Sequence, residues 1–513
     1  MRTHLRLLLS ILVISTLPTG LSRCSTQPPD TSVGVDSSCD EGDAQPGRDA
    51  GAGHDAGETS RCRGVTLQAS DLDNYATLLD CLRNPAPEAE RIEAVSTFIT
   101  AVESHDGLPI VGQGQVVFVY VRSADWDGLD DTTPGEAFEP GRRNLPIRVA
   151  GDFNSWNVES WVLRQEAANF FHVSVPISPT SATRWGYKLI AKDEAGNDVW
   201  FSDPLSRRFV FDASGRLSIV RGDDDQGQLE WIRSVHARRL NVDRSITLYL
   251  PRGYDTNPSK RYPVLYMHDG NNLFDAHQPR SASESWEVDE TANAEIEAGR
   301  VREFIVVGIP NNDNRLGEYT PVADEYEGST VGGDGELYAD FIVSDLKPLI
   351  DGRYRTLAGP ESTAVLGSSL GGVISFFIGL EHPQTFKYIG GMSSTFDWGS
   401  ALGNPTLPDQ YAEMPDLASR RQVYYLDSGG GPEQDGTCPS DGPNDGRDNY
   451  CETLEMKGTL EAAGISTYPL DPNADRLQPD DIDIYHWWQP NAPHSEASWR
   501  ARMFRPLRLF FRP

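Results

Sequence analysis

The sequence predicts an α/β protein in which a mainly parallel sheet is preceded by an antiparallel β-sandwich and a short helical segment. Apolar residues first recur at helical spacing, between residues 62 and 106. From residue 107 the pattern changes to short β-rich runs separated by turn residues, which is typical of an antiparallel sandwich. From 228 to 513, strand-like and helix-like runs alternate, which indicates a largely parallel sheet.

The N-terminal residues resemble a secretion signal. A short basic start precedes the apolar run 7–14, and small or turn-forming residues follow, so we expect residues 1–22 to be a signal peptide. Lipid attachment at Cys24 is the alternative to a free secreted form. Residues 23–61 contain almost no large apolar side chains, which predicts a disordered acidic linker. We therefore expect a secreted, periplasmic or cell-surface protein.

Charge and cysteine content exclude several classes of function. The formal net charge of −31 repels phosphate backbones, so we expect no nucleic-acid partner. No later run reaches transmembrane length. Among six cysteines, Cys62 with Cys81 and Cys438 with Cys451 are expected to form disulfides, as is usual in exported proteins. None has zinc-site spacing, and neither a metal nor an organic cofactor is expected.

The segment 62–106 is expected to form two helices joined near Pro85 and Pro87. Their apolar positions are Leu72, Tyr75, Leu78, Leu79 and Leu82, then Ile92, Val95, Phe98 and Val102. The sandwich at 107–222 has strand candidates at 116–121, 145–153, 170–177 and 184–191, and the acidic run 222–227 is its exit linker.

The domain at 228–513 carries the alternating pattern. Its strand candidates are 246–251, 263–269, 304–310, 362–367, 388–393, 423–428 and 482–488. Helices are expected at 337–353, 371–380 and 451–463, with a final helical run at 495–511.

The sharpest motif is Gly-Ser-Ser-Leu-Gly at 367–371, which matches G-x-S-x-G. A β-branched apolar run precedes it and an apolar helical run follows it. A tight strand-to-helix turn exposes the serine hydroxyl, and the flanking glycines relieve backbone crowding. The sequence therefore predicts that Ser369 is a nucleophile; the alternative is a simple Gly/Ser loop.

A serine nucleophile needs a base, and in such folds the acid and then the histidine follow the serine along the chain. After Ser369 the histidines are His382, His486 and His494. His382 ends the helix after the motif, and His486 lies inside an apolar strand. His494 lies in the loop after that strand, where a mobile base belongs, and is the predicted base.

The acid is expected after the strand at 423–428. The candidates are Asp427, Asp435, Asp441, Asp445 and Asp448. Asp427 ends the strand, whereas Asp448 precedes the next helix, where a Cys438–Cys451 bridge would fold the loop back. This Asp/Gly-rich loop lacks the EF-hand pattern of a calcium site.

Two backbone amides are expected to stabilise an oxyanion. The first is the amide of Leu370, directly after the nucleophile, and the second is that of Asn271, in the loop after an early strand. His268 and Asp269 in that loop have no third ligand at a supportive spacing, so we expect them to brace the loop.

Together these residues resemble the esterase-D-like branch of the α/β-hydrolases, which includes enterochelin, feruloyl and acetylxylan esterases. The resemblance spans about 240–511. Its landmarks are the runs 262–270, 307–309, 367–372 and 426–429, Arg315 with Glu318 and Tyr319, and His494 followed by Trp499. The resemblance implies an α/β-hydrolase fold, and it implies Asp448 as the acid, displaced by an insertion that carries Cys438.

The sandwich resembles immunoglobulin-like modules related to glycogen-binding domains. The run 151–156 carries this likeness, with Tyr187-Lys188 and Asp203-Pro204 downstream. The resemblance implies glycan contact through Trp156 and Trp185, by stacking on a sugar ring. The alternative is that Trp156 packs in the sandwich core and that this module only walls the cleft.

The predicted function is a secreted serine esterase that acts through an acyl-enzyme on small-molecule or polysaccharide esters, with hydroxycinnamoyl or acetyl glycan esters and siderophore lactones as candidate substrates. Arg315, Asn311 and Glu318 are expected to line the cleft or brace its loops. The alternatives are a catalytically silent glycan-binding surface protein and a serine peptidase, which uses the same triad.

Overall fold

The described part of the chain lies C-terminal to the acidic linker. The computed structural model describes residues 62, 68–122, 146–166, 169–179, 184–192, 196–212, 215–220, 227–274, 285–432, 438, 448–468 and 483–513. The expected signal peptide, the linker and Cys24 lie outside these residues, as do Asp435, Asp441 and Asp445. No helix within these ranges is long and apolar enough to cross a membrane.

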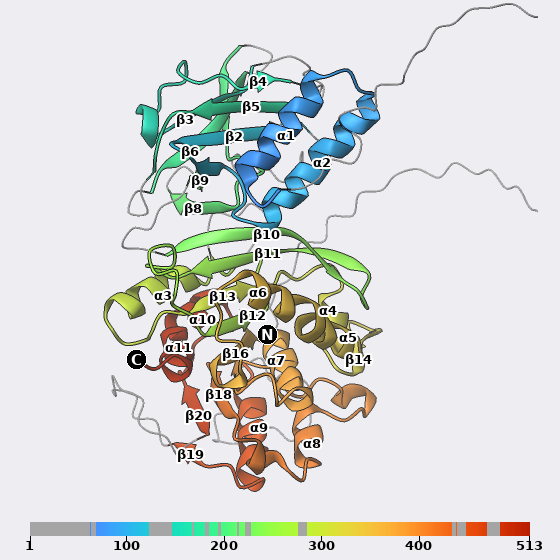
Figure 1. The fold of residues 1–513 in the computed structure, drawn as a ribbon. Helices are drawn as coiled ribbons and strands as arrows, with labels where there is room; N and C mark the ends of the chain where they lie inside the picture. Colours follow the sequence, from blue (N-terminus) through green and yellow to red (C-terminus); the bar gives the residue numbers. More distant parts are fainter. Residues whose placement is uncertain are drawn as a thin grey trace, which may run out of the picture. The chain divides into compact units, whose positions relative to one another are not determined.

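Two helices, α1 (Asp71–Arg83) and α2 (Glu88–Ser104), open the fold, as the periodicity predicted (Figure 1). Ser70 caps α1 by accepting a hydrogen bond from the N–H of Asp73, and the Cys62–Cys81 disulfide holds its C-terminal part. The helices pack on a four-stranded antiparallel sheet, whose order is β1 (Ile110–Gly112), β2 (Gln115–Val121), β5 (Phe170–Val175) and β4 (Arg164–Gln165).

A second antiparallel sheet completes a β-sandwich. Its strands are β3 (Arg148–Gly151), β6 (Gly186–Lys192), β7 (Asp198–Phe201), β8 (Arg208–Asp212) and β9 (Gly215–Ile219). The alternation of side chains along β2 explains the layers. Val117 and Val119 face the helices, whereas Phe118 faces the second sheet. The predicted antiparallel sandwich is confirmed.

The second sheet continues into the C-terminal domain. The strand β10 (Gln228–Ala237) pairs with β8 on one side and with β11 (Val242–Leu250) on the other, and all three are antiparallel. The strands that follow are β12 (Val264–Met267), β13 (Ile305–Gly308), β16 (Thr363–Ser368), β17 (Tyr388–Met392), β18 (Val423–Ser428), β19 (Thr467–Tyr468) and β20 (Ile484–Trp488).

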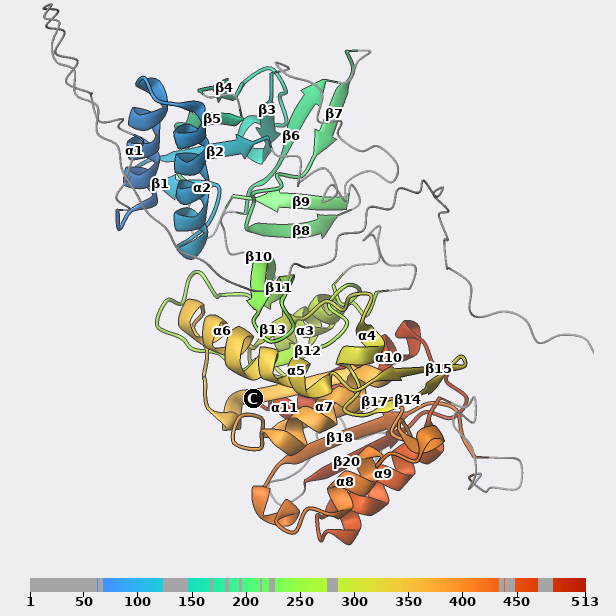
Figure 2. The ribbon, with the colours of Figure 1, turned by 90° about the vertical axis from the view of Figure 1, so that its right-hand side faces the viewer.

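These later strands form the parallel half of the sheet, in the order β19-β20-β18-β17-β16-β12-β13, and β11 joins it antiparallel to β13. Helices connect and cover them: α3 (Val288–Glu297), α4 (Arg315–Glu318), α5 (Gly335–Asp340), α6 (Lys347–Arg353), α7 (Leu370–Glu381), α8 (Leu407–Ala412), α9 (Tyr450–Ala462), α10 (Glu496–Arg502) and α11 (Phe504–Phe510). Helices α8 and α9 lie side by side next to β18 and β20 (Figure 2).

Alternate residues along the parallel strands pack into two separate hydrophobic cores, one on each face of the sheet. Tyr266 and Val365 pack with α7 and α9 on one face, whereas Leu265 and Leu366 pack with α3 and α11 on the other. Burial on both faces explains why these strands are continuous apolar runs in the sequence. The strand β16 lies between β12 and β17, so the residue after it emerges at the centre of the parallel half.

Several elements were not predicted. The helix expected at 337–353 is a continuous run of α5, a π-helical segment (Phe341–Leu346) and α6. The strands β7 to β10, the helix α3 and the hairpin of β14 (Ala323–Tyr326) and β15 (Ser329–Gly332) were missed. In β10, the buried Glu230 is paired with Arg207 and Arg208, and its charge interrupts the apolar pattern that predicts a buried strand.

Candidate active site

Ser369 lies at the sharp turn between β16 and α7, with φ 55° and ψ −126°. Any residue other than glycine is strained in this backbone conformation, and such strain is typical of a serine presented at a strand-to-helix turn. A Cβ on Gly367 would lie 2.5 Å from the backbone of Gly371, so the close approach that forms the turn requires glycine. The local geometry predicted from the motif is present.

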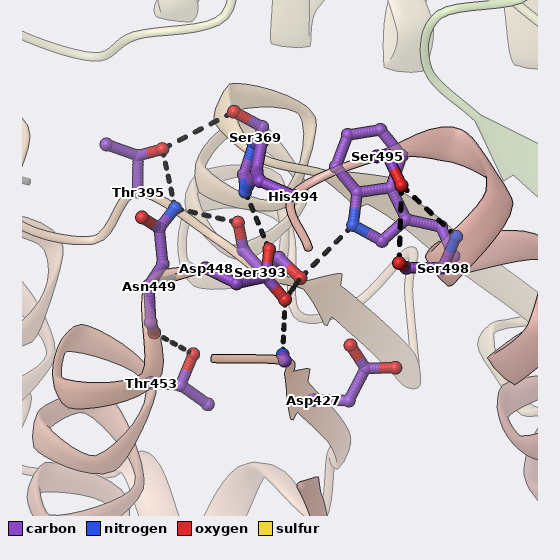
Figure 3. A network of polar contacts seen from close by, with 12 residues as sticks. Ser369, Ser393, Thr395, Asp427, Asp448, Asn449, Thr453, His494, Ser495 and Ser498 are labelled. Carbon is purple, nitrogen blue, oxygen red and sulfur yellow. Dashed lines mark hydrogen bonds and ion pairs between the residues drawn. The ribbon is translucent and has the colours of Figure 1, made fainter. Parts of the chain in front are cut away.

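The hydroxyl of Ser369 has a polar neighbour that the sequence did not identify. Its Oγ lies 3.4 Å from Oγ1 of Thr395, in the loop after β17 (Figure 3). The side-chain amide of Asn449 donates to that same Oγ1 at 3.0 Å and to the carbonyl of Ser393 at 2.8 Å. Asn449 therefore connects the turn at Ser369 to the segment that carries Asp448.

His494 and Asp448 are in contact. The imidazole Nδ1 lies 2.8 Å from Oδ1 of Asp448, whose side chain is 1% exposed, whereas that of His494 is 38% exposed (Figure 3). A carboxylate only accepts hydrogen bonds, so Nδ1 donates and Nε2 keeps the lone pair that a general base needs. The ring of Trp499 packs edge-on against the imidazole, with ring centres 5.0 Å apart.

Asp427, the other candidate acid, has different partners. It is fully buried, accepts a hydrogen bond from the hydroxyl of Tyr425 at 2.8 Å and pairs with Arg502 at 3.1 Å. Burial raises the pKa of its carboxyl, although Arg502 acts in the opposite direction. Of these two candidates, the fold brings Asp448 to His494.

The other two histidines lie away from Ser369. His382 follows the last residue of α7. His486 lies in β20, and burial lowers the pKa of its imidazole to about 4. Both positions agree with the roles expected for them from the sequence, at a helix end and inside a strand.

The loop after β12 approaches the start of α7. A Cβ on Gly371 would lie 3.3 Å from Oδ2 of Asp269, which itself has φ 57°. The N–H of Asp269 donates to the hydroxyl of Tyr319 at 3.0 Å. Arg315 donates to both carboxylate oxygens of Asp269, from Nε at 2.7 Å and from Nη2 at 2.9 Å.

The residues expected to line the cleft mostly brace this loop. Asn311 donates its side-chain amide to Asp269 at 2.6 Å and its N–H to Oδ1 of Asn271 at 2.8 Å. The Arg315 side chain is 30% exposed, yet its charge is paired with Asp269. Glu318 is buried against Arg244 and does not reach the surface. Arg315 and Asn311 thus fix Asn271 and Asp269.

The two expected oxyanion donors are the backbone N–H groups of Leu370 and Asn271. Leu370 is the first residue of α7, and the first N–H groups of a helix have no partner within the helix. Within the described ranges, neither the N–H of Leu370 nor that of Asn271 donates a hydrogen bond. The positive end of the α7 dipole adds to the first donor.

The sequence prediction missed Ser393, Thr395 and Arg502, which contact the triad candidates, and the role of Asn449, which binds Ser393 and Thr395. A signal for two of them existed, because Ser393 and Thr395 directly follow a parallel strand, where site residues gather. Among the residues that the structure describes, no group of three or more His, Cys, Asp or Glu could hold a metal.

Comparisons with known proteins show the family to which this chain belongs. A family model described as "Putative esterase" matches residues 237–509, which is more than half of the chain. Uncharacterized protein YbbA of Bacillus subtilis (strain 168) is 34% identical over 164 residues, which cover 31% of this chain and 60% of that protein.

Two further relatives are similar over about half of this chain. An endo-1,4-beta-xylanase/feruloyl esterase of Xylanibacter ruminicola is 26% identical over 329 residues, 56% of this chain and 40% of that protein. This chain thus spans less than two thirds of the length of these two curated relatives. A solved IroE-like serine hydrolase from Shewanella oneidensis is 19% identical, with a TM-score of 0.41, over 56% of this chain and 80% of that one.

Proposed function

This chain belongs to the esterase family, and on that basis we propose that it hydrolyses carboxylic esters with Ser369 as the nucleophile. One observation carries the proposal. The imidazole of His494 is held by a buried carboxylate at 2.8 Å, while Ser369 is presented in a strained turn at the carboxyl end of the central strand. An oriented base and a serine hydroxyl that is only partly buried are the two groups that acyl transfer requires.

The reaction proceeds in two steps. Nε2 of His494 removes the proton from Oγ of Ser369 as Oγ attacks the ester carbonyl carbon, and Asp448 stabilises the imidazolium that forms. The imidazolium then gives its proton to the departing alcohol oxygen, which leaves an acyl-enzyme. Water, deprotonated by the same imidazole, attacks the acyl carbon, and the imidazolium returns the proton to Oγ of Ser369 as the bond between the acyl carbon and Oγ breaks and the acid leaves.

The negative charge on the carbonyl oxygen is stabilised by backbone donors. The N–H groups of Leu370 and Asn271 suit this role, since neither donates a hydrogen bond to another of the described residues. Such donors act in the transition state, and removal of one commonly lowers kcat by about 10²–10³-fold. The contacts of Arg315 and Asn311 hold the Asn271 side of this arrangement in place.

The substrate class that we favour is an acyl ester of a polysaccharide. The relative from Xylanibacter ruminicola is named for xylanase and feruloyl esterase activities. The Cys62–Cys81 and Cys438–Cys451 disulfides support export, where intact polysaccharide is encountered. We expect hydroxycinnamoyl or acetyl glycan esters to be cleaved in preference to siderophore lactones.

The proposal is tested with short p-nitrophenyl esters and then with methyl ferulate and acetylated xylan. Ser369→Ala should lower kcat by about a thousandfold or more, because the nucleophile is lost. Ser368→Ala is the matched control, since Ser368 is a buried neighbour whose hydroxyl has no partner within the described residues. Full turnover by Ser369→Ala, or equal loss in both variants, would refute the assignment.

A glycan contact on the sandwich is a second candidate function. Trp156 is 36% exposed and pairs with Trp200 at 6.1 Å, so it does not fill the core. Trp185 instead packs toward the core beside Phe153, which leaves Trp156 as the stacking residue. Trp156→Ala should reduce retention of the protein on insoluble starch. Trp488→Ala, which changes a similarly exposed tryptophan, should not reduce it. Equal retention of wild type and both variants would refute this function.

A further inference from the structure

Ser393 has a hydroxyl in which every hydrogen-bonding position is used. It follows β17, is fully buried and has φ 47°. Its Oγ accepts from Nε1 of Trp499 at 3.1 Å and from Nη2 of Arg502 at 2.9 Å. It donates to Oδ2 of Asp448 at 2.8 Å (Figure 3). A hydroxyl offers one proton and two lone pairs, so two donors direct its single proton at the carboxylate.

We propose that Ser393 is a positioning residue, whose hydroxyl, oriented by Trp499 and Arg502, holds the carboxylate of Asp448 in the rotamer that presents Oδ1 to His494. The inference rests on the proposed function, because it assigns a residue that acts through the triad acid. Ser393 touches neither the nucleophile nor the base in any contact within the described residues, so its effect passes through Asp448.

Both oxygens of Asp448 are thereby assigned. Oδ1 receives the imidazole Nδ1, while Oδ2 receives the hydroxyl of Ser393 and the N–H of Gly429. A carboxylate with only its Oδ1 contact could rotate about its side-chain torsion, which is broad for aspartate. Donors on Oδ2 stop this rotation and keep the acid in line with the base.

Arg502 is itself fixed by a second buried carboxylate. Its side chain is 2% exposed, with Nη2 lying 3.1 Å from Asp427 and 3.7 Å from Asp448. Two buried carboxylates require a compensating charge, which explains why an arginine is buried beside the triad. Asp427 thus has a role as the partner of Arg502 rather than as a second triad acid.

The C-terminal segment supplies both the base and the residues that orient the acid. His494 lies in the loop before α10, and Trp499 and Arg502 lie on α10. Docking of this short helix therefore sets the position of the imidazole and the direction of the Ser393 proton together. Ser393 therefore differs from a buried hydroxyl that only satisfies its own hydrogen bonds, because its orientation is linked to the position of the imidazole.

The test is a double-mutant cycle between Ser393→Ala and Asp448→Asn in the full mature protein, with p-nitrophenyl acetate as substrate. Ser393→Ala alone should lower kcat about tenfold or more at nearly constant KM, on the scale of a lost hydrogen bond to a charged group. In the Asp448→Asn background the same change should alter kcat by less than about twofold, because the residue through which Ser393 acts is already disabled.

Ser394→Ala is the matched control, because Ser394 is equally buried in the same loop and its Oγ has no partner within the described residues. Its kcat should equal that of wild type. Equal losses for Ser393→Ala in both backgrounds, or no loss in the wild-type background, would overturn the proposal and leave a structural role.

A second readout does not depend on turnover. In wild type, the Nδ1–H of His494 should give a downfield proton NMR signal, since it is hydrogen bonded to a fixed carboxylate. Ser393→Ala should weaken or abolish that signal, and Ser394→Ala should keep it. Persistence of the signal in Ser393→Ala overturns the positioning role. Absence of ester turnover in wild type would instead refute the proposed function.

Discussion

At the scale of single residues, two buried carboxylates beside one arginine have separate roles. Asp448 contacts His494, whereas Asp427 contacts Tyr425 and Arg502. The two side chains are chemically identical, so their roles differ only because the turn before α9 and the end of β18 place them beside different partners. Substitution should therefore affect catalysis at one position and stability at the other.

Asp448→Asn should lower kcat by about 10³–10⁴-fold, as happens when an orienting aspartate becomes an amide in a serine triad. Asp427→Asn should retain most of kcat but lower the free energy of unfolding by about 3 kcal/mol, because a partner of a buried ion pair is lost. Steady-state kinetics and urea unfolding of both variants check this. The opposite assignment of effects would exchange their roles.

His268 makes stability depend on pH. Burial lowers the pKa of its imidazole from 6.5 to about 3, and its Nδ1 lies 3.0 Å from the hydroxyl of Tyr338. Between these two pH values the unfolded chain binds a proton that the folded chain does not, so stability falls as pH falls, by roughly 1.4 kcal/mol per pH unit.

His268→Gln should remove that slope, because glutamine does not titrate. Urea unfolding of the variant and of wild type at pH 6, 5 and 4 (values within the window of about 6.5 to 3) checks this. His382→Gln is the comparison: burial lowers the pKa of the His382 imidazole as well, but by less, so its substitution should reduce the slope less. An unchanged slope in His268→Gln would show that another group controls acid unfolding.

At the scale of elements, the turn before α9 carries Asp448, the proposed acid. Asp448 and Asn449 both have φ near 60°, a strained conformation that the surroundings must enforce. Asn449 is the N-cap residue of α9, and the Cys438–Cys451 disulfide lies just beyond it. The disulfide therefore anchors the segment on which the position of Asp448 depends.

Replacing both Cys438 and Cys451 by Ser should lower kcat about tenfold as well as stability. The matched control is the double variant Cys62→Ser with Cys81→Ser. Because the two disulfides close loops of comparable length, its free energy of unfolding should also fall by about 3 kcal/mol. Its kcat should not change. Kinetics and thermal unfolding of the two double variants compare them. Equal kcat in both would mean that the disulfide does not hold the acid.

At the scale of the whole molecule, β10 joins the sandwich to the parallel sheet. Its Glu230 is buried between Arg207 and Arg208 and accepts a hydrogen bond from the hydroxyl of Tyr354, after α6. Burial by itself would raise the pKa of Glu230, yet the two guanidiniums lower it to about 2. Its stabilisation is present above pH 4.5 and is lost as pH falls toward 2.

Glu230→Gln should therefore lower the free energy of unfolding by about 3 kcal/mol at neutral pH, because two buried arginines lose their counter-charge. Turnover should not change, since these residues lie on the strands that join the two sheets and not at Ser369. Guanidinium unfolding monitored by tryptophan fluorescence measures the first effect. A loss of kcat with unchanged stability would contradict this assignment.

Much of the fold followed from local patterns. The parallel strands were visible because both of their faces are buried, which leaves unbroken apolar runs such as that of β16. The elements that were missed are those whose burial depends on distant partners. Glu230 is an example, because a carboxylate in β10 argues against a buried strand, and only the pairing with Arg207 and Arg208 explains its burial.

The sequence by itself determined the family and the turn that presents Ser369, and the turn could be predicted because it depends on residues adjacent in the chain. Only the tertiary structure showed the contact between His494 and Asp448, the acid that the family resemblance implied, since that contact joins residues 46 positions apart. It also decided the role of Ser393, whose partner Arg502 lies 109 positions away. Contacts of this kind arise when α10 docks on the sheet, and no local pattern records them.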